Sequence, residues 1–198
     1  MPLIKLNNRS IKDVTSLPFG VGNLIHISSQ TASNSASISF TTGIDSTYKE
    51  YQFYFIDIHP RTDAVKFQFN MSTDGGSNYN VTKTTTYFRT YHDEADTATT
   101  LAYGSSQDLA QSTAFQSISE GIGNGADEIT IGCLSLFNPS STTYVKHFIS
   151  NSNTYTEDNF SENDYVAGYG NTTSAINAIQ FKMSSGNFDG TIAMFGVL

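Results

Sequence analysis

Short runs of alternating hydrophobic and polar residues recur along the chain from residue 24 to residue 197. Alternation with a period of two is typical of strands with one buried face, and clusters of Gly, Asn, Asp and Ser between the runs are typical of turns. No stretch shows a convincing apolar stripe at helical spacing. The predicted strands are 24–30, 36–41, 51–58, 65–71, 79–89, 112–120, 129–137, 143–150, 165–169, 175–183 and 191–197.

Two runs support more detailed predictions. In 51–58, aromatic and isoleucine side chains occupy both parities, so we expect a central strand that is covered on both faces. In 65–71 apolar and polar residues alternate cleanly, and the polar turn 73–78 leads into 79–89. This pattern predicts a hairpin of the two strands.

About ten short strands at this spacing favour an all-β fold, an antiparallel β-sandwich or jelly roll. A chain of 198 residues fits a single domain with one core. The passage Pro18-Phe-Gly20 separates the alternating body from the residues before it. We therefore expect one β-sandwich domain over 21–198, preceded by an extended N-terminal arm over 1–20.

The first 20 residues carry a charge of +2, which leaves −10 for the rest of a chain whose net charge is −8. A basic segment before an acidic body predicts a docking arm that contacts acidic surface on a neighbouring subunit, with apolar residues adding contact area. The alternative is a frayed terminus. The predicted interaction residues are Leu3, Ile4, Lys5, Leu6, Arg9, Ile11 and Lys12.

The acidic balance excludes several classes of partner. A net charge of −8 argues against nucleic acid and anionic membranes, which bind clustered Lys and Arg. No stretch approaches the roughly 20 apolar residues of a membrane span, and we expect a chain made in the cytosol without an export signal. Cys133 lies in the apolar run 129–137, which predicts a buried, unreactive thiol.

Residues that could carry chemistry are few and scattered. His92, Asp93, Glu94 and Asp96 could bind a divalent cation, but a solvated acidic loop is favoured because no second ligand set at a recognisable spacing accompanies them. His147 shares its parity with neighbouring apolar residues, which favours a core or interface position. Motifs of serine hydrolases, phosphate loops and zinc sites are missing from the sequence. We predict a protein that is not an enzyme and that has no cofactor, although carboxylates paired by folding are invisible in one sequence.

Three segments carry a resemblance to a known class of proteins. They are 38–51 leading into Phe55-Ile-Asp-Ile-His-Pro60, then 137–148, and finally 178–196. The last segment joins a strand, a turn Ser185-Gly-Asn-Phe188 and a final Gly-Thr-Ile strand, as in C-terminal hairpins of phage structural proteins. In these segments the chain resembles virion structural proteins of marine tailed bacteriophages, either head decoration or tail-associated proteins.

The resemblance implies a non-enzymatic virion component that is assembled in the host cytoplasm. A capsid decoration or cement protein would bind the assembled head, stabilise it, and contact the major capsid protein or other virion proteins. Such proteins commonly form homotrimers. The alternative is a tail or fibre domain that binds a host-surface receptor or glycan. The sequence shows no stalk repeat, which favours decoration, and the lack of Trp disfavours a sugar-binding platform, although the 11 Tyr residues could replace it.

Overall fold

The computed structural model describes residues 23–198. The predicted arm and all seven predicted interaction residues (Leu3, Ile4, Lys5, Leu6, Arg9, Ile11 and Lys12) lie outside the described residues. Within 23–198 the chain forms twelve strands. They are β1 Leu24–Ser35, β2 Ile38–Phe40, β3 Glu50–Pro60, β4 Val65–Ser72, β5 Lys83–Asp93, β6 Thr99–Tyr103, β7 Gln116–Ile122, β8 Thr130–Phe137, β9 Lys146–Tyr155, β10 Phe160–Gly170, β11 Ala178–Met183 and β12 Phe188–Val197.

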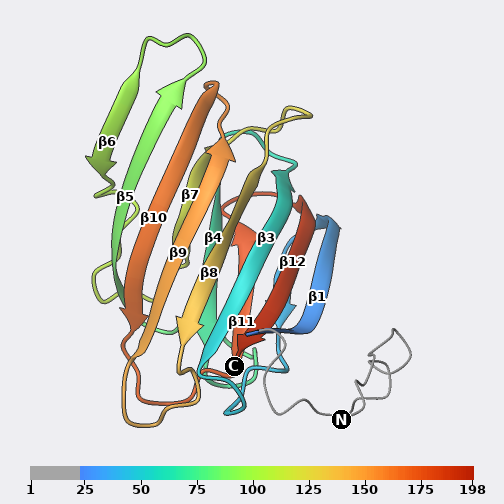
Figure 1. Cartoon of the computed structure of the whole chain (residues 1–198), viewed down its shortest axis with the longest axis vertical. Coiled ribbons are helices and arrows are strands. Elements are labelled where there is room, and N and C mark those ends of the chain that lie inside the picture. Colours follow the sequence, from blue (N-terminus) through green and yellow to red (C-terminus); the bar gives the residue numbers. More distant parts are fainter. Residues whose placement is uncertain (1–22) are drawn as a thin grey trace, which may run out of the picture.

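The strands form two antiparallel sheets that pack face to face (Figure 1). The larger sheet has eight strands in the order β1-β12-β3-β8-β9-β10-β5-β6, and the smaller has four in the order β2-β11-β4-β7. The all-β fold, predicted from alternation alone, is therefore confirmed as a β-sandwich. No helix in the described part of the chain is long and apolar enough to cross a membrane.

The chain often passes from one sheet to the other where the sequence predicted a hairpin. β4 pairs with β7 and β11, whereas β5 pairs with β10 and β6, so the turn 73–78 connects two layers. The prediction of a hairpin within the C-terminal segment 178–196 is also wrong, because β11 belongs to the smaller sheet and β12 to the larger. Turn residues reveal that a chain reverses, but they do not reveal which strand it pairs with next.

Strand β3 lies inside the larger sheet, but only one of its faces is buried. Phe53 and Phe55 are fully or almost fully buried, while Ile56 is 46% exposed, so the prediction of cover on both faces is wrong. A bulge explains the apolar residues on both parities. Asp57 adopts a φ of 51°, and the register of β3 against β8 shifts between Phe55 and Ile58. This bulge reverses the alternation, so the side chain of Ile58 points into the core.

Aromatic rings join the two layers in the middle of the sandwich. Phe181 of β11 lies 5.5 Å from Phe53 and 5.3 Å from Phe55 of β3, measured between ring centroids. Phe67 of β4 lies 5.3 Å from Phe55 in an edge-to-face arrangement. Such contacts between large apolar side chains are the main favourable contribution to folding here.

The two sheets differ in width, and this difference positions the polar site. The smaller sheet ends at β7, which packs against β9 and β10, so no strand of it lies against β5. The segment after β6 fills part of the gap, with hydrogen bonds from Lys83 N to Ser112 O and from Thr85 N to Leu109 O. Polar side chains fill the rest.

Candidate functional site

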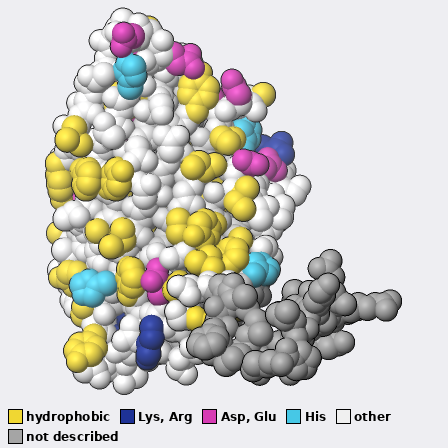
Figure 2. All heavy atoms as spheres, in the orientation of Figure 1, with side chains coloured by type: hydrophobic (Ala, Val, Ile, Leu, Met, Phe, Trp, Pro, Cys, Tyr) yellow, Lys and Arg dark blue, Asp and Glu magenta, His cyan; other side chains and the backbone are white. Residues whose placement is uncertain are grey.

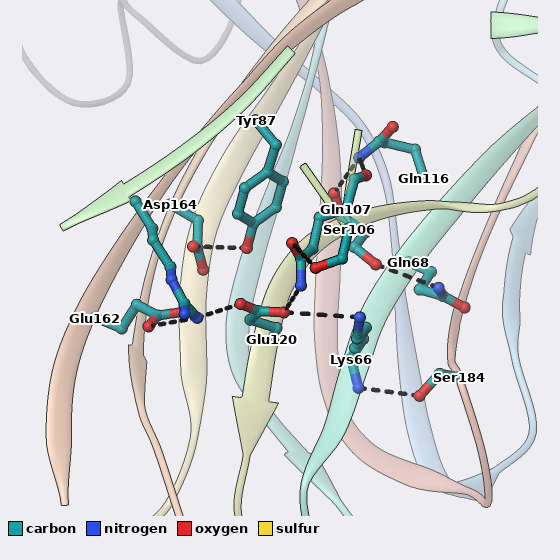
Figure 3. Close-up of polar contacts among 12 residues, drawn as sticks. Lys66, Gln68, Tyr87, Ser106, Gln107, Gln116, Glu120, Glu162, Asp164 and Ser184 are labelled. Atoms are coloured by element: carbon teal, nitrogen blue, oxygen red, sulfur yellow. Dashed lines mark hydrogen bonds and ion pairs between the residues drawn. The ribbon is translucent and has the colours of Figure 1, made fainter. Parts of the chain in front are cut away.

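A group of polar side chains, the polar seam, occupies the uncovered edge of the sandwich (Figure 3). Its members are Tyr87 and Arg89 of β5, Glu120 of β7, and Glu162 and Asp164 of β10. The period of two along β5 and β10 directs these side chains inward, on the same side as Val166. The seam therefore lies at the edge strand β7 of the smaller sheet, where the core meets β5 and β10.

Arg89 bridges two carboxylates in the seam. Its Nη1 donates a hydrogen bond to Glu120 Oε1 and another, of 3.2 Å, to Glu162 Oε2. The second oxygen of Glu120 accepts a hydrogen bond from Gln107 Nε2 and lies 3.6 Å from Lys66 Nζ. Both oxygens of Glu120 thus have partners, as a buried carboxyl group requires.

The other two carboxyl groups of the seam are more deeply buried. Tyr87 donates a hydrogen bond of 2.6 Å from its hydroxyl to Asp164 Oδ1. Burial raises the pKa of Asp164, and the neighbouring charge of Glu162 raises it further. Burial also raises the pKa of Glu162, while the charge of Arg89 opposes that shift. The two carboxyl groups together therefore retain a proton to higher pH than ordinary carboxyl groups do.

A cleft of about 420 Å³ opens beside the seam. It is lined by Ala64, Lys66, Arg89, Tyr91, Glu120, Gly121, Thr156, Glu157, Asp158, Phe160 and Glu162. The rings of Tyr91 and Phe160 lie 4.7 Å apart and form an aromatic wall. Four carboxylates thus line the cleft against two cationic side chains.

Most carboxylate oxygens of the seam are engaged with side chains of neighbouring strands. Glu120 is occupied by Arg89, Gln107 and Lys66, and Glu162 shares Arg89 with it. The arrangement is one that holds strands β5, β7 and β10 together.

The outer surface of the larger sheet differs from this cleft, and we call its central part the uncharged face. It consists of the outward positions of β5, β8, β9 and β10, and none of them is Asp, Glu, Lys or Arg. These residues are Thr84, Thr86, Phe88, Thr90, His92, Ile131, Cys133, Ser135, Phe137, His147, Ile149, Asn151, Asn153, Tyr155, Ser161, Asn163, Tyr165, Ala167 and Tyr169. In Figure 2 hydrophobic and uncharged polar side chains mingle over this side, and acidic side chains gather towards its upper end.

Aromatic side chains stand exposed on the uncharged face. Phe88 and Tyr165 stack with ring centroids 5.0 Å apart and an angle of 8° between their planes, and each is about two-fifths exposed, at 42% and 41%. A shallow groove of about 490 Å³ lies nearby, with His147, Ile149 and Tyr169 in its lining. A surface of this kind loses little charge solvation when another molecule covers it.

The predicted acidic loop is a turn stabilised by its own side chains. Asp93 Oδ1 accepts hydrogen bonds of 2.8 Å from the backbone of Thr97 and Ala98, and His92 Nε2 lies 3.0 Å from Asp96 Oδ1. No group of three His, Cys, Asp or Glu residues within 23–198 has an arrangement that could hold a metal ion. Strand β6 follows this turn and was not among the strands predicted from the sequence.

Two further predictions have different outcomes. His147 is exposed and Lys146 is buried, so of the two positions predicted for His147 the core position is wrong, and the interface position stays a prediction. Lys146 Nζ donates to the backbone oxygens of Tyr144 and Thr172, at 2.6 and 3.3 Å, which satisfies the buried ammonium group. Cys133 is half-buried rather than buried, but burial still raises the pKa of its thiol to about 11, so the prediction of an unreactive thiol agrees with its surroundings.

Sequence reasoning missed the polar seam because the predicted strand 165–169 began too late. The chain alternates Glu162, Asp164 and Val166 on one face of β10, which starts at Phe160. The signal in the sequence was that Glu162 and Asp164 alternate in register with Val166, so all three side chains point to the same, buried face of the strand. Arg89 was assigned to a strand but not to a partner, because nothing in the sequence places it beside Glu120.

Compared with protein-family models, with curated proteins and with solved structures, the chain matches none of them. Its function is therefore argued from the uncharged face and the cleft.

Proposed function

We propose that this protein is a non-enzymatic structural component of a bacteriophage virion, a decoration or cement protein that docks through its uncharged face. The observation that carries the proposal is the lack of charged side chains on the outward positions of four adjacent strands, in a chain with a net charge of −8. Burying charge without a partner costs several kcal/mol, so a face without charge is the part of this molecule best suited to a protein interface.

The proposed partners are the major capsid protein, other virion proteins and further copies of this chain in a homotrimer. Two acidic molecules repel each other, and contact through the uncharged face keeps their charges apart. Exposed aromatic and aliphatic residues, among them Phe88, Ile149 and Tyr165, supply the apolar area for such a contact. A protein that binds only the assembled head would stabilise it by mass action.

The test is co-sedimentation of the full chain with particles that lack it. Ile149→Asp places a charge in the middle of the uncharged face, at a side chain that is 55% exposed, and should abolish binding while the fold persists. Tyr144→Asp is the matched control, since Tyr144 is 69% exposed in the loop between β8 and β9 and lies outside the face. Equal binding by the two variants would refute docking through this face.

A second candidate function is recognition of a neutral host-surface glycan by a tail or fibre domain. The observation that favours it is the stacked pair Phe88 and Tyr165 beside the amide groups of Asn151 and Asn163, whose side chains lie 3.1 Å apart. Aromatic rings next to amides suit sugar rings and their hydroxyl groups. Binding of the chain to a neutral glycan on an array, lost in Tyr165→Ala, would favour this function over capsid decoration.

A further inference from the structure

The cleft beside the polar seam has an excess of negative charge. Both of its cations, Lys66 and Arg89, are committed to Glu120 and Glu162. Glu157 and Asp158 have no ion-pair partner among residues 23–198. Burial raises the pKa of Glu157, and the charges of nearby acids, including Asp158, raise it further. The second effect is expected where the electrostatic potential of the cleft is negative.

One buried carboxylate oxygen at the cleft has no hydrogen-bond partner. It is Oε2 of Glu157, a residue that lines the cleft. The carboxyl group of Glu162 is instead engaged with Arg89 and with the carboxyl group of Asp164. A buried acceptor without a donor is unfavourable, so a ligand that brings a donor to Glu157 would gain free energy on binding.

The shape of the cleft favours an organic cation over a metal ion. No arrangement of three or more metal-ligating side chains occurs in the described part of the chain. The aromatic wall of Tyr91 and Phe160 suits the alkyl stem or the charged head of a long basic side chain. An ammonium or guanidinium group could donate to the open oxygen of Glu157.

We propose that this cleft binds a basic side chain of segment 1–22, supplied by a neighbouring copy of the chain. The segment holds Lys5, Arg9 and Lys12 against a single acid, and it precedes β1, which lies at the edge of the larger sheet remote from the cleft. Charge complementarity between the basic segment and the acidic cleft selects this occupant. The inference rests on the proposed assembly function and adds the contact that links one copy to the next.

The receptor in the test is the full chain with Lys5, Arg9 and Lys12 changed to Gln, so that its own segment does not compete. A fluorescein-labelled peptide of residues 1–22 is titrated against it and followed by fluorescence anisotropy. Glu157→Gln in this receptor should weaken peptide binding about tenfold, the effect of one charge-assisted hydrogen bond. Asp158→Asn, at an exposed side chain, should weaken it by a smaller factor and serves if Glu157→Gln disturbs the fold.

Asp96→Asn is the matched control, because it also removes one negative charge but at a side chain that is 91% exposed and outside the cleft. Equal binding by the Glu157→Gln and Asp96→Asn receptors would overturn the assignment to the cleft, and so would a peptide that does not bind at all. A peptide with Gln in place of its three cations should not bind.

Sedimentation equilibrium distinguishes binding of segment 1–22 from a neighbouring copy from binding of the same chain's own segment. The wild-type chain should associate with rising concentration, and the receptor without the three cations should associate less. A wild-type monomer that nevertheless binds the peptide would overturn delivery by a neighbour. Ile149→Asp should leave peptide binding unchanged, so loss of particle docking and loss of peptide binding report on the two proposals separately.

Discussion

The inner layer of the sandwich is filled in two different ways. Under the smaller sheet, aromatic rings of β3, β4 and β11 meet edge to face, whereas at its edge strand β7 the polar seam takes their place. Both regions are buried by strands of the same larger sheet, and both follow the same alternation. The difference shows that burial on one face of a strand does not require apolar residues, provided that the neighbouring strands supply partners for each charge.

The aromatic region should be the more sensitive to truncation. Phe53→Ala or Phe181→Ala removes a fully buried ring and leaves a cavity, so the free energy of unfolding should fall by about 3 to 5 kcal/mol. Denaturant melts measure this loss. Ile56→Ala, on the exposed face of the same strand β3, should cost less than about 1 kcal/mol. A loss for Phe53→Ala as small as that of Ile56→Ala would mean that β3 does not face the core.

Removing the central cation should weaken the polar seam by a smaller amount. Arg89→Met leaves Glu162 without a cation and Glu120 with Lys66 alone, and should cost about 2 to 3 kcal/mol, less than for a wholly buried pair because Arg89 is one-third exposed. Adding Glu162→Gln to Arg89→Met should recover part of this loss. A double-mutant cycle in denaturant melts checks the coupling, and strictly additive losses would contradict the bridge.

The seam should also make stability depend on pH, with a defined sign. The pKa values of Asp164 and Glu162 are raised in the folded state, so between about pH 5 and about pH 8 these two groups bind more protons in the folded chain than in the unfolded chain. The free energy of unfolding contributed by this pair therefore decreases as the pH rises towards neutrality and beyond. The lowered pKa values of Asp74 and Asp189 act in the opposite direction, but only at more acidic pH.

Thermal melts of the wild type and Asp164→Asn between about pH 5 and about pH 8 measure this contribution. Asn keeps an oxygen that can accept the Tyr87 hydroxyl and removes the titrating group. The wild type should lose stability over this range, and the variant should lose less. Parallel curves for the two proteins would show that Asp164 titrates as an ordinary carboxyl group.

The smallest effect on stability is expected outside both inner regions. Ile149→Asp and Tyr144→Asp change exposed side chains and should each alter the free energy of unfolding by no more than about 0.5 kcal/mol. Denaturant melts check this expectation. A large loss for Ile149→Asp would mean that the uncharged face contributes to folding as well as to docking.

Local sequence patterns were sufficient to locate the strands but not to predict which strands pair with each other. Alternation located eleven of the twelve strands, and it missed β6, whose residues Thr99–Tyr103 are exposed and pair only with β5. Around His147 the alternation of apolar and polar residues fits either orientation of the strand, so the sequence could not decide whether His147 or Lys146 faces inward. Lys146 and Lys83 face inward because backbone and amide oxygens receive their ammonium groups, and such oxygens carry no signal in a sequence.

The sequence by itself determined the fold class, the single acidic body and the lack of recognisable catalytic motifs, because these depend on composition and on the period of two along each strand. The tertiary structure alone decided which turns cross between sheets, that the smaller sheet ends at β7, and that Arg89 meets Glu120 and Glu162. The uncharged face likewise exists only once β5, β8, β9 and β10 lie side by side. Pairing between distant strands depends on the total burial and hydrogen bonding of the whole molecule, and no local run of residues contains that information.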